Sequence, residues 1–307
     1  MARFVVTATE LNLRSSPVIT PDNRIATMPQ GLAVTLIEEG EQGWVKVHAK
    51  LDGVEHVGWA AARFLARAAE VEFDVIKPRA SGKLPPVHMG ESNPMITRAN
   101  PRGRAFPLGE PGQPARKSGS TADRARALTS IVDWLDVERS ARHLPENTPE
   151  GGRNTFCNIY AYDYAYLAGV YLPRVWWLPA AIRKLQRGEP VQRKYGQTVH
   201  ELDANSLYLW FVEHSEAFGW NRNDDLTAAQ DAANQGKVVI VAAINRGGIG
   251  HIAAVVPETG AFRAVRTGGT VTRPLTSQAG GRNLKYYVGP GRWWLDPRFK
   301  HGFWIHA

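Results

Sequence analysis

The sequence contains a single cysteine, Cys157, among its 307 residues. One cysteine cannot form a disulfide within the chain, and it excludes every metal site built on a Cys-x-x-Cys pair. Nine histidines are present, but no His-Glu-x-x-His motif occurs. The sequence therefore offers no structural metal centre and calls for no cofactor.

Long apolar runs are also missing. No segment approaches the roughly 18 consecutive apolar residues of a membrane-spanning helix, so no membrane span is expected. The first residues, MARFVVTATELNLRSSP, lack the order of basic, apolar and small residues that defines a signal peptide. The N-terminal residues therefore do not predict a signal for export from the cytoplasm.

Positive charge is in excess, with a formal net charge of +8 and a pI of about 9.7. Such a surface attracts polyanions, including nucleic acid, acidic wall polymers and anionic membranes. Much of the excess lies between Lys77 and Arg126, in a Pro- and Gly-rich stretch typical of a solvated linker. Because no zinc finger, basic zipper or aromatic RNA-binding signature is present, we expect no specific nucleic-acid partner.

Residues 1–66 have the pattern of a small all-β domain. Short β-branched runs, VVTA, AVTLIEE, WVKVHA and HVGWAAARFL, alternate with turn signals rich in Ser, Pro, Asp and Gly. The order of LNLRSSP, GWVKV and GW resembles the bacterial SH3-like domain, a small barrel. That resemblance implies binding to cell-wall peptides or packing beside a catalytic domain, and we expect Trp44 and Trp59 to lie in the barrel core.

Residues 67–120 form a Pro/Gly-rich basic segment with little periodicity, which predicts a linker. A second domain, residues 121–307, follows it. Helices are predicted from Ser120 or Thr121, over 155–168, over 204–218 and over 226–234, and strands follow at VVIVAAI, HIAAVV, FRAV and NLKYYV. Helices first and an antiparallel sheet afterwards indicate an α+β fold.

Cys157 lies in the segment GGRNTFCNIYAYD. Asn154 or Thr155 can cap the following helix and so place the sulfur in its first turn. Free backbone N–H groups and the positive end of the helix dipole favour thiolate, the nucleophilic form. The alternative is a small buried apolar side chain, which free cysteine often is.

His251 begins the strand HIAAVV, whose alternation puts His251, Ala253 and Val255 on one face. The small side chains there leave room for a helix to pack closely, so that a thiol on that helix reaches the imidazole. The alternative is a structural histidine without a role in chemistry. The sequence around each of the other eight histidines is less suited to a catalytic base.

Together, NTFCNIYAYD and GKVVIVAAINRGGIGHIAAVVPE resemble the papain-like cell-wall hydrolases of the NlpC and CHAP types, over residues 121–307. The resemblance implies Cys157 as nucleophile and His251 as base. It also implies a polar third residue that fixes the imidazole tautomer, for which we choose Gln278, with Asn283 second. No Glu, Asp or His stands plainly in that place.

Further site residues are predicted around this pair. The Cys157 backbone N–H and the Asn154 side chain are candidate oxyanion donors. Trp176 and Trp177 are nominated to contact substrate, although most aromatic residues of this domain are expected in the core. Asp163 faces away from the sulfur by helical geometry and is expected to be structural.

The predicted function is hydrolysis of a peptide or amide bond in the stem peptide of peptidoglycan, as an endopeptidase rather than an amidase. The SH3-like domain would bind the wall without taking part in chemistry, so a chain beginning near Ser120 should retain turnover. Two alternatives stay open: a deamidase or transglutaminase-like enzyme acting on protein, and a catalytically inert wall-binding protein. Action in the wall, the periplasm or outside the cell fits a phage lysin, a remodelling enzyme or an injected toxin, and a toxin implies an immunity or delivery partner.

Overall fold

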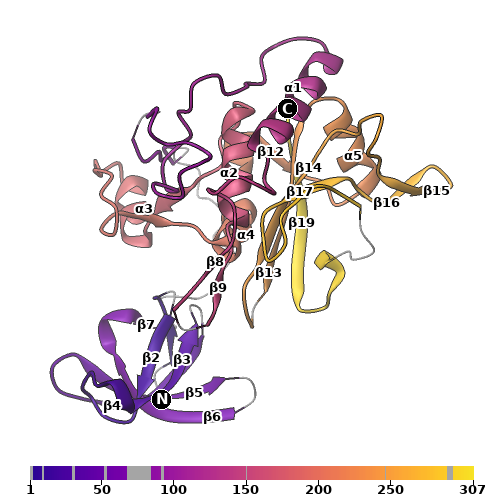
Figure 1. The fold of residues 1–307 in the computed structure, drawn as a ribbon. Helices are drawn as coiled ribbons and strands as arrows, with labels where there is room; N and C mark the ends of the chain where they lie inside the picture. The colour runs from indigo at the N-terminus through magenta and orange to yellow at the C-terminus, as the bar shows by residue number, and fades with distance from the viewer. Residues whose placement is uncertain are drawn as a thin grey trace. The chain divides into compact units, whose positions relative to one another are not determined.

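The computed structural model (Figure 1) describes residues 3–8, 10–29, 32–51, 54–67, 84–90, 93–149, 151–245, 247–288 and 293–307. The chain divides into two compact units, residues 1–81 and residues 82–307. Within the described residues, no helix is both long and apolar enough to cross a membrane.

The first unit is a seven-stranded antiparallel sheet. In spatial order its strands are β3 (Arg24–Pro29), β2 (Glu10–Arg14), β6 (Val54–Ala61), β5 (Trp44–Leu51), β4 (Ala33–Glu39), β1 (Arg3–Val6) and β7 (Leu65–Arg67). Alternation along each strand turns one set of side chains inward. The resulting core consists of Val6, Leu11, Leu13, Met28, Val34, Val47, Ala49 and Ala60.

Trp44 and Trp59 do not belong to this core, contrary to the prediction. Both are only half-buried, because they alternate with the inward-facing Val45, Val47 and Ala60. The Trp59 ring lies over the turn at Gly40, where an added Cβ would be 2.4 Å from the ring atom Cζ3.

A six-stranded antiparallel sheet forms the centre of the second unit. Its spatial order is β12 (Trp220–Arg222), β19 (Phe299–His306), β13 (Val238–Asn245), β14 (His251–Val255), β17 (Thr276–Gln278) and β18 (Leu284–Tyr287). Three strand pairs lie outside it: β8 (Glu146–Asn147) with β9 (Arg153–Asn154), β10 (Val175–Trp177) with β11 (Val199–Glu201), and β15 (Val265–Thr267) with β16 (Thr270–Arg273).

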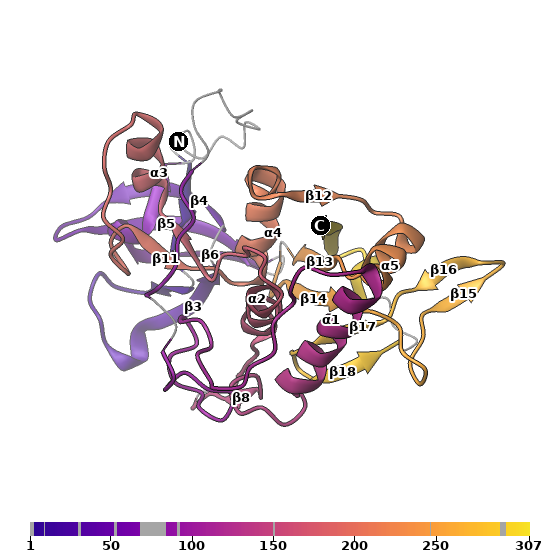
Figure 2. The ribbon, with the colours of Figure 1, turned by 90° about the horizontal axis from the view of Figure 1, so that it is seen from above.

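Helices cover both faces of this sheet (Figure 2). On one face lie α1 (Thr121–Leu135), α2 (Cys157–Leu167) and α4 (Ala204–Glu213), and on the other lies α5 (Leu226–Asn234). A shorter helix, α3 (Pro179–Gln186), adds Ala181 to the first of these cores. The predicted α+β class is therefore correct.

Local sequence signals located the start of α1 and both ends of α5, whereas α3 was not predicted. Ser120 and Asp123 form a capping box at α1, and the apolar stripe Leu128, Ile131, Val132 and Leu135 is its buried face. The predicted helix over 226–234 matches α5, whereas the one over 204–218 stops at Glu213 and continues as a 3-10 turn, Ser215–Phe218. The prediction did not include β19.

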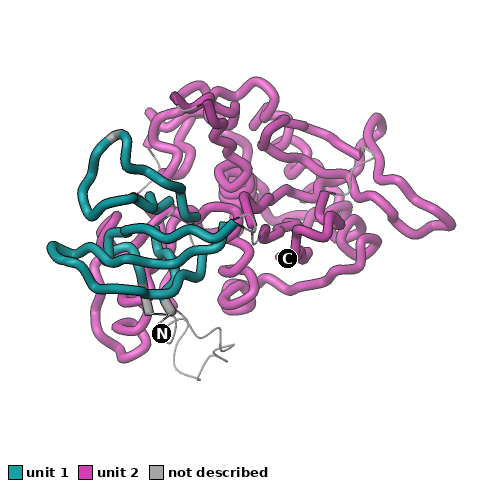
Figure 3. The backbone as a smooth tube through the Cα atoms, turned by 90° about the horizontal axis from the view of Figure 1, so that it is seen from below, with its two compact units in different colours: residues 1–81 teal, residues 82–307 magenta. Residues whose placement is uncertain are grey.

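The predicted linker is wrong for residues 84–120, which belong to the second unit (Figure 3). Val87 is 2% exposed and Leu108 is fully buried, and both join the core around α2. Arg116 donates to the carbonyl oxygens of Ala168, Gly236 and Ala307. The residues that make these contacts are not regularly spaced along the chain. The segment therefore shows neither a helical nor a strand pattern in the sequence. Residues 68–83 of the predicted linker lie outside the described residues.

Candidate active site

Cys157 is the first residue of α2, and only 4% of it is exposed. The N-cap is Phe156, which makes no side-chain capping hydrogen bond. Asn154 lies exposed on β9, so the prediction that Asn154 or Thr155 caps this helix is wrong. The proposed oxyanion role of the Asn154 side chain stays a prediction.

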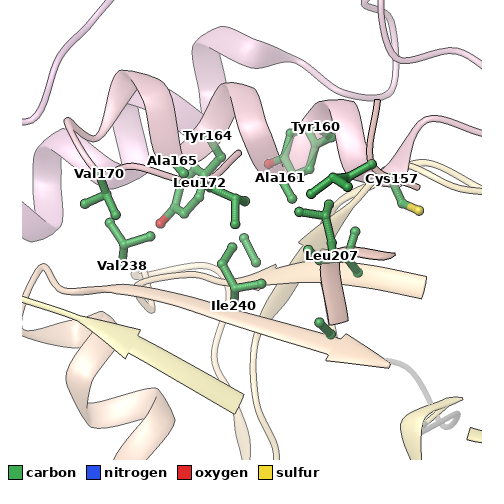
Figure 4. Packing of buried hydrophobic residues seen from close by; sticks show 14 of the residues in the cluster. Cys157, Tyr160, Ala161, Tyr164, Ala165, Val170, Leu172, Leu207, Val238 and Ile240 are labelled. Atoms are coloured by element: carbon green, nitrogen blue, oxygen red, sulfur yellow. The ribbon is translucent and has the colours of Figure 1, made fainter. Parts of the chain in front are cut away.

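Backbone N–H groups lie close enough to the Cys157 sulfur to lower the pKa of its thiol. They come from Cys157 itself and Asn158 in the first turn of α2, and from Ile252 on β14. In Figure 4 the sulfur points away from the other labelled core residues, at the end of the apolar cluster. The thiol therefore lies beside the backbone residue that directly follows His251.

His251 is the first residue of β14 and is half-buried. The prediction that α2 packs on the face shared by His251, Ala253 and Val255 is wrong. Ile252 and Ala254 pack in the core with α2, and Ala253 and Val255 pack in the core with α5. The sulfur is therefore linked to β14 through the backbone of Ile252, and in the described residues no hydrogen bond joins it to the imidazole.

Gln278 is hydrogen-bonded to His251, with 3.1 Å between the imidazole Nε2 and the amide Oε1. Because an amide oxygen only accepts hydrogen bonds, Nε2 is the donor in this pair, and in the neutral imidazole Nδ1 is then unprotonated. Asn283 is engaged elsewhere: its Nδ2 donates to the carbonyl oxygens of Val137 and His143, at 2.7 and 3.0 Å. The geometry of the third position therefore favours Gln278 over Asn283.

Burial dominates the electrostatics of both groups. It raises the pKa of the Cys157 thiol to about 11, and the backbone N–H groups of Ile252, Asn158 and Cys157 offset it only in part. The carboxylate of Asp203, the N-cap of α4, adds to the increase. Burial also lowers the pKa of His251, against the hydrogen bond to Gln278. The resting pair is therefore a thiol beside a neutral imidazole, where the helix start alone predicted a thiolate.

This protonation state predicts slow alkylation. At about pH 7.5, iodoacetamide should modify Cys157 in the native protein about 100-fold more slowly than in the urea-unfolded chain, because only thiolate reacts and burial makes it scarce. Rates measured by mass spectrometry across the alkaline range should continue to rise well above the ordinary thiol pKa of about 8.5. Faster alkylation of the native protein near pH 6 would instead establish a thiolate-imidazolium pair.

The nominated substrate-contacting tryptophans lie in the core, which corrects the prediction. Trp176 is 4% and Trp177 3% exposed, so neither offers a substrate appreciable surface. The Trp177 indole donates to the carbonyl of Pro85, and its ring borders an open pocket lined also by Pro86, Val191, Gln192 and Arg193. Trp293, in contrast, is half-buried and packs edge to face on His251, with ring centroids 4.5 Å apart.

Asp163 belongs to a fully buried ionic cluster under α2. It accepts hydrogen bonds from Arg142 at 2.6 and 3.0 Å and from His143 at 2.9 Å. Burial alone would raise the pKa of Asp163, but the charge of Arg142 and these hydrogen bonds hold it below its usual range. Burial lowers the pKa of His143, so the cluster is one neutralised ion pair with a neutral imidazole. Asp163 is structural, as its helical position predicted.

Two asparagines that were not predicted from the sequence, Asn158 and Asn205, link the start of α2 to the segment before β14 through hydrogen bonds. Asn158 Nδ2 donates to the carbonyl of Leu202, just before α4, at 2.8 Å. Asn205, in the first turn of α4, donates to the carbonyl of Gly248 and accepts from the N–H of Asn245, both at 2.9 Å. The starts of α2 and β14 are therefore fixed through α4. The only available sequence signal was the position of Asn158 directly after the cysteine.

Neither a metal site nor a similarity to known proteins adds to the description of this site. Among the described residues, no three His, Cys, Asp or Glu side chains are grouped so that they could hold a metal ion. No protein-family model matches the chain, and a search of curated proteins finds none with significant sequence similarity.

Proposed function

We propose that the second unit is a papain-like cysteine hydrolase that cleaves a peptide or amide bond in the stem peptide of peptidoglycan. One observation carries the proposal. His251 is hydrogen-bonded through Nε2 to Gln278, and the N–H of the next residue, Ile252, meets the sulfur of the only cysteine. This arrangement supports the roles of nucleophile for Cys157, base for His251 and orienting group for Gln278.

The protonation states indicate general-base catalysis in the first step. With the thiol protonated and Nδ1 of His251 free to accept, the imidazole takes the thiol proton as sulfur attacks the carbonyl carbon. Sulfur forms a bond to that carbon, and the carbonyl oxygen becomes an oxyanion. The backbone N–H groups of Cys157 and Asn158, in the first turn of α2, interact with the sulfur, and they support an oxyanion hole there.

Collapse of the tetrahedral intermediate completes the acyl transfer. The C–N bond breaks while the imidazolium returns its proton to the leaving amine, which gives a thioester on Cys157. Water then attacks the thioester, His251 takes a proton from that water, and the thiol is restored as the acid product leaves. Gln278 orients the ring throughout without adding a charge, so the imidazolium stays a strong enough acid to protonate the amine.

The first unit supports wall peptides as the substrate class. Its strand pattern resembles an SH3-like barrel, and we propose that it holds the enzyme on the wall. Trp44 and Trp59 are half-buried outside its core, so part of each ring is available for contact. The whole chain carries a net charge of +8, which favours its association with an anionic wall polymer.

Digestion of purified muropeptides, followed by mass spectrometry, tests the proposal. We expect stem peptides to be cut between two amino acids, giving two fragments whose summed mass exceeds that of the substrate by one water. Release of the intact stem from its sugar would indicate an amidase. A gain of one mass unit with loss of ammonia would indicate a deamidase, and unchanged muropeptides together with retained sacculus binding would indicate an inert wall-binding protein.

A further inference from the structure

Gly280 lies against the ring of His251. It is buried, and a Cβ added to it would be 3.1 Å from Cε1 and 3.9 Å from Nδ1 of the imidazole. Carbon atoms in favourable contact are about 3.5–4.0 Å apart, so even an alanine would push on this ring. No side chain fits at residue 280 unless the imidazole or the backbone moves.

The backbone at Gly280 is held in place. Its N–H donates to Oδ1 of Asn283 at 2.9 Å, and the amide nitrogen of Asn283 is bonded to the carbonyls of Val137 and His143. Val137 follows α1, and His143 is fully buried in the ionic cluster under α2. Gly280 therefore cannot move back easily, and a larger residue would displace the imidazole instead.

Trp293 makes a second contact with the same ring. The two rings meet at 80° with centroids 4.5 Å apart, a favourable edge-to-face arrangement. Trp293 is itself fixed by edge-to-face contacts with Trp294 and Phe299, and Trp294 is 4% exposed in the core under α5. The indole therefore borders one side of the His251 ring.

We propose that Gly280 and Trp293 are positioning residues that clamp the His251 ring, so that Nε2 stays on Gln278 and Nδ1 stays available to the thiol. This inference rests on the proposed Cys-His mechanism for its effect on turnover. The clamp supplies the orientation that a lone hydrogen bond from Nε2 of His251 to the neutral Gln278 leaves incomplete, because that bond allows the imidazole to rotate about the donor nitrogen.

Adjacent glycines provide a matched pair of variants. Gly281 is exposed and has no atom within 4 Å of an added Cβ, and neither it nor Gly280 has a positive φ. We expect Gly280→Ala to lower kcat about tenfold with KM within about twofold, since displacements well under 1 Å at a reacting group are costly. Gly281→Ala should behave as the unaltered protein.

The same comparison applies to the 3-10 turn Trp293–Leu295. Trp293→Ala should lower kcat about tenfold or more, and Trp293→Phe should restore much of it because a ring again meets the imidazole. Leu295, on the same turn, is 49% exposed, and Leu295→Ala should leave kcat unchanged. Thermal unfolding of every variant shows whether the fold is retained.

A nuclear magnetic resonance readout separates this inference from the proposed function. In ¹⁵N-histidine-labelled protein, the Nε2–H of His251 should give a resolved signal, identified by its loss in His251→Gln. The signal should shift or disappear in Gly280→Ala and in Trp293→Ala, and persist in Gly281→Ala and Leu295→Ala. If this pattern holds while muropeptides stay uncut, the clamp stands and the proposed substrate fails. An unchanged signal and unchanged kcat in both Gly280→Ala and Trp293→Ala would overturn the clamp.

Discussion

Replacement of Cys157 by alanine should lower kcat/KM on muropeptides by about 10⁴-fold or more. The reason is that Cys157 is the only thiol in the chain, so no other sulfur can form the acyl-enzyme. Replacement by serine should be nearly as damaging, because a hydroxyl holds its proton more tightly than a thiol and a neutral imidazole is a modest base. Product formation measured by mass spectrometry over long incubations sets the residual rate.

Two controls make this result specific. The free energy of unfolding of the Cys157→Ala protein should lie within about 2 kcal/mol of that of the unaltered protein, since only one small buried atom is removed. His251→Ala should lose a similar factor, and the double variant should lose little more, as expected for two groups that act in one step. A purified Cys157→Ala protein that still cut muropeptides would rule out thiol chemistry.

A chain that begins at Ser120 should fail to fold, although the predicted linker implied that it would retain turnover. It lacks Val87 and Leu108, which are buried in the core around α2, and full burial of such side chains contributes about 1.5–3 kcal/mol each. It also lacks Arg116 with its three carbonyl partners. These losses together are comparable with the total stability of about 5–15 kcal/mol of an ordinary domain.

A chain that begins at Gly82, the start of the second unit, is the matched comparison. It should give a cooperative thermal transition and cut soluble muropeptides, and it should bind sacculi less well than the full chain. Circular dichroism and the muropeptide assay check both fragments. Cooperative unfolding and full turnover of the chain starting at Ser120 would show that residues 82–119 are dispensable, against the contacts described here.

Local signals in the sequence predicted a good part of the fold. Capping and periodicity located α1 and α5 because both signals act within a few residues of the chain. The resemblance to the papain-like hydrolases led to Gln278 as the neighbour of His251, and the two side chains are hydrogen-bonded. The catalytic roles of Cys157, His251 and Gln278 stay predictions until the variants are measured.

Other features depend on contacts between distant residues. Strand alternation correctly divided the side chains of β14 between the two faces of the sheet. It could not show which face packs against α2 and which against α5. Trp176 and Trp293 are both tryptophans, and the residues around them in the sequence do not distinguish their roles. Only tertiary packing makes the first a core residue and the second a neighbour of His251. β19 was missed because its sequence, FKHGFWIH, interrupts the alternation with a glycine and two histidines.

The place of β19 in the sheet has a consequence for synthesis. β19 follows both β12 and β13 in the chain, yet it lies between them in the sheet. While it is still within the ribosome, the apolar strand β13, VVIVAAIN, has one unpaired edge. Such an edge pairs readily with other chains. The second unit must therefore complete its sheet after residue 306 emerges, and chaperones that cover β13 should raise the yield of native protein.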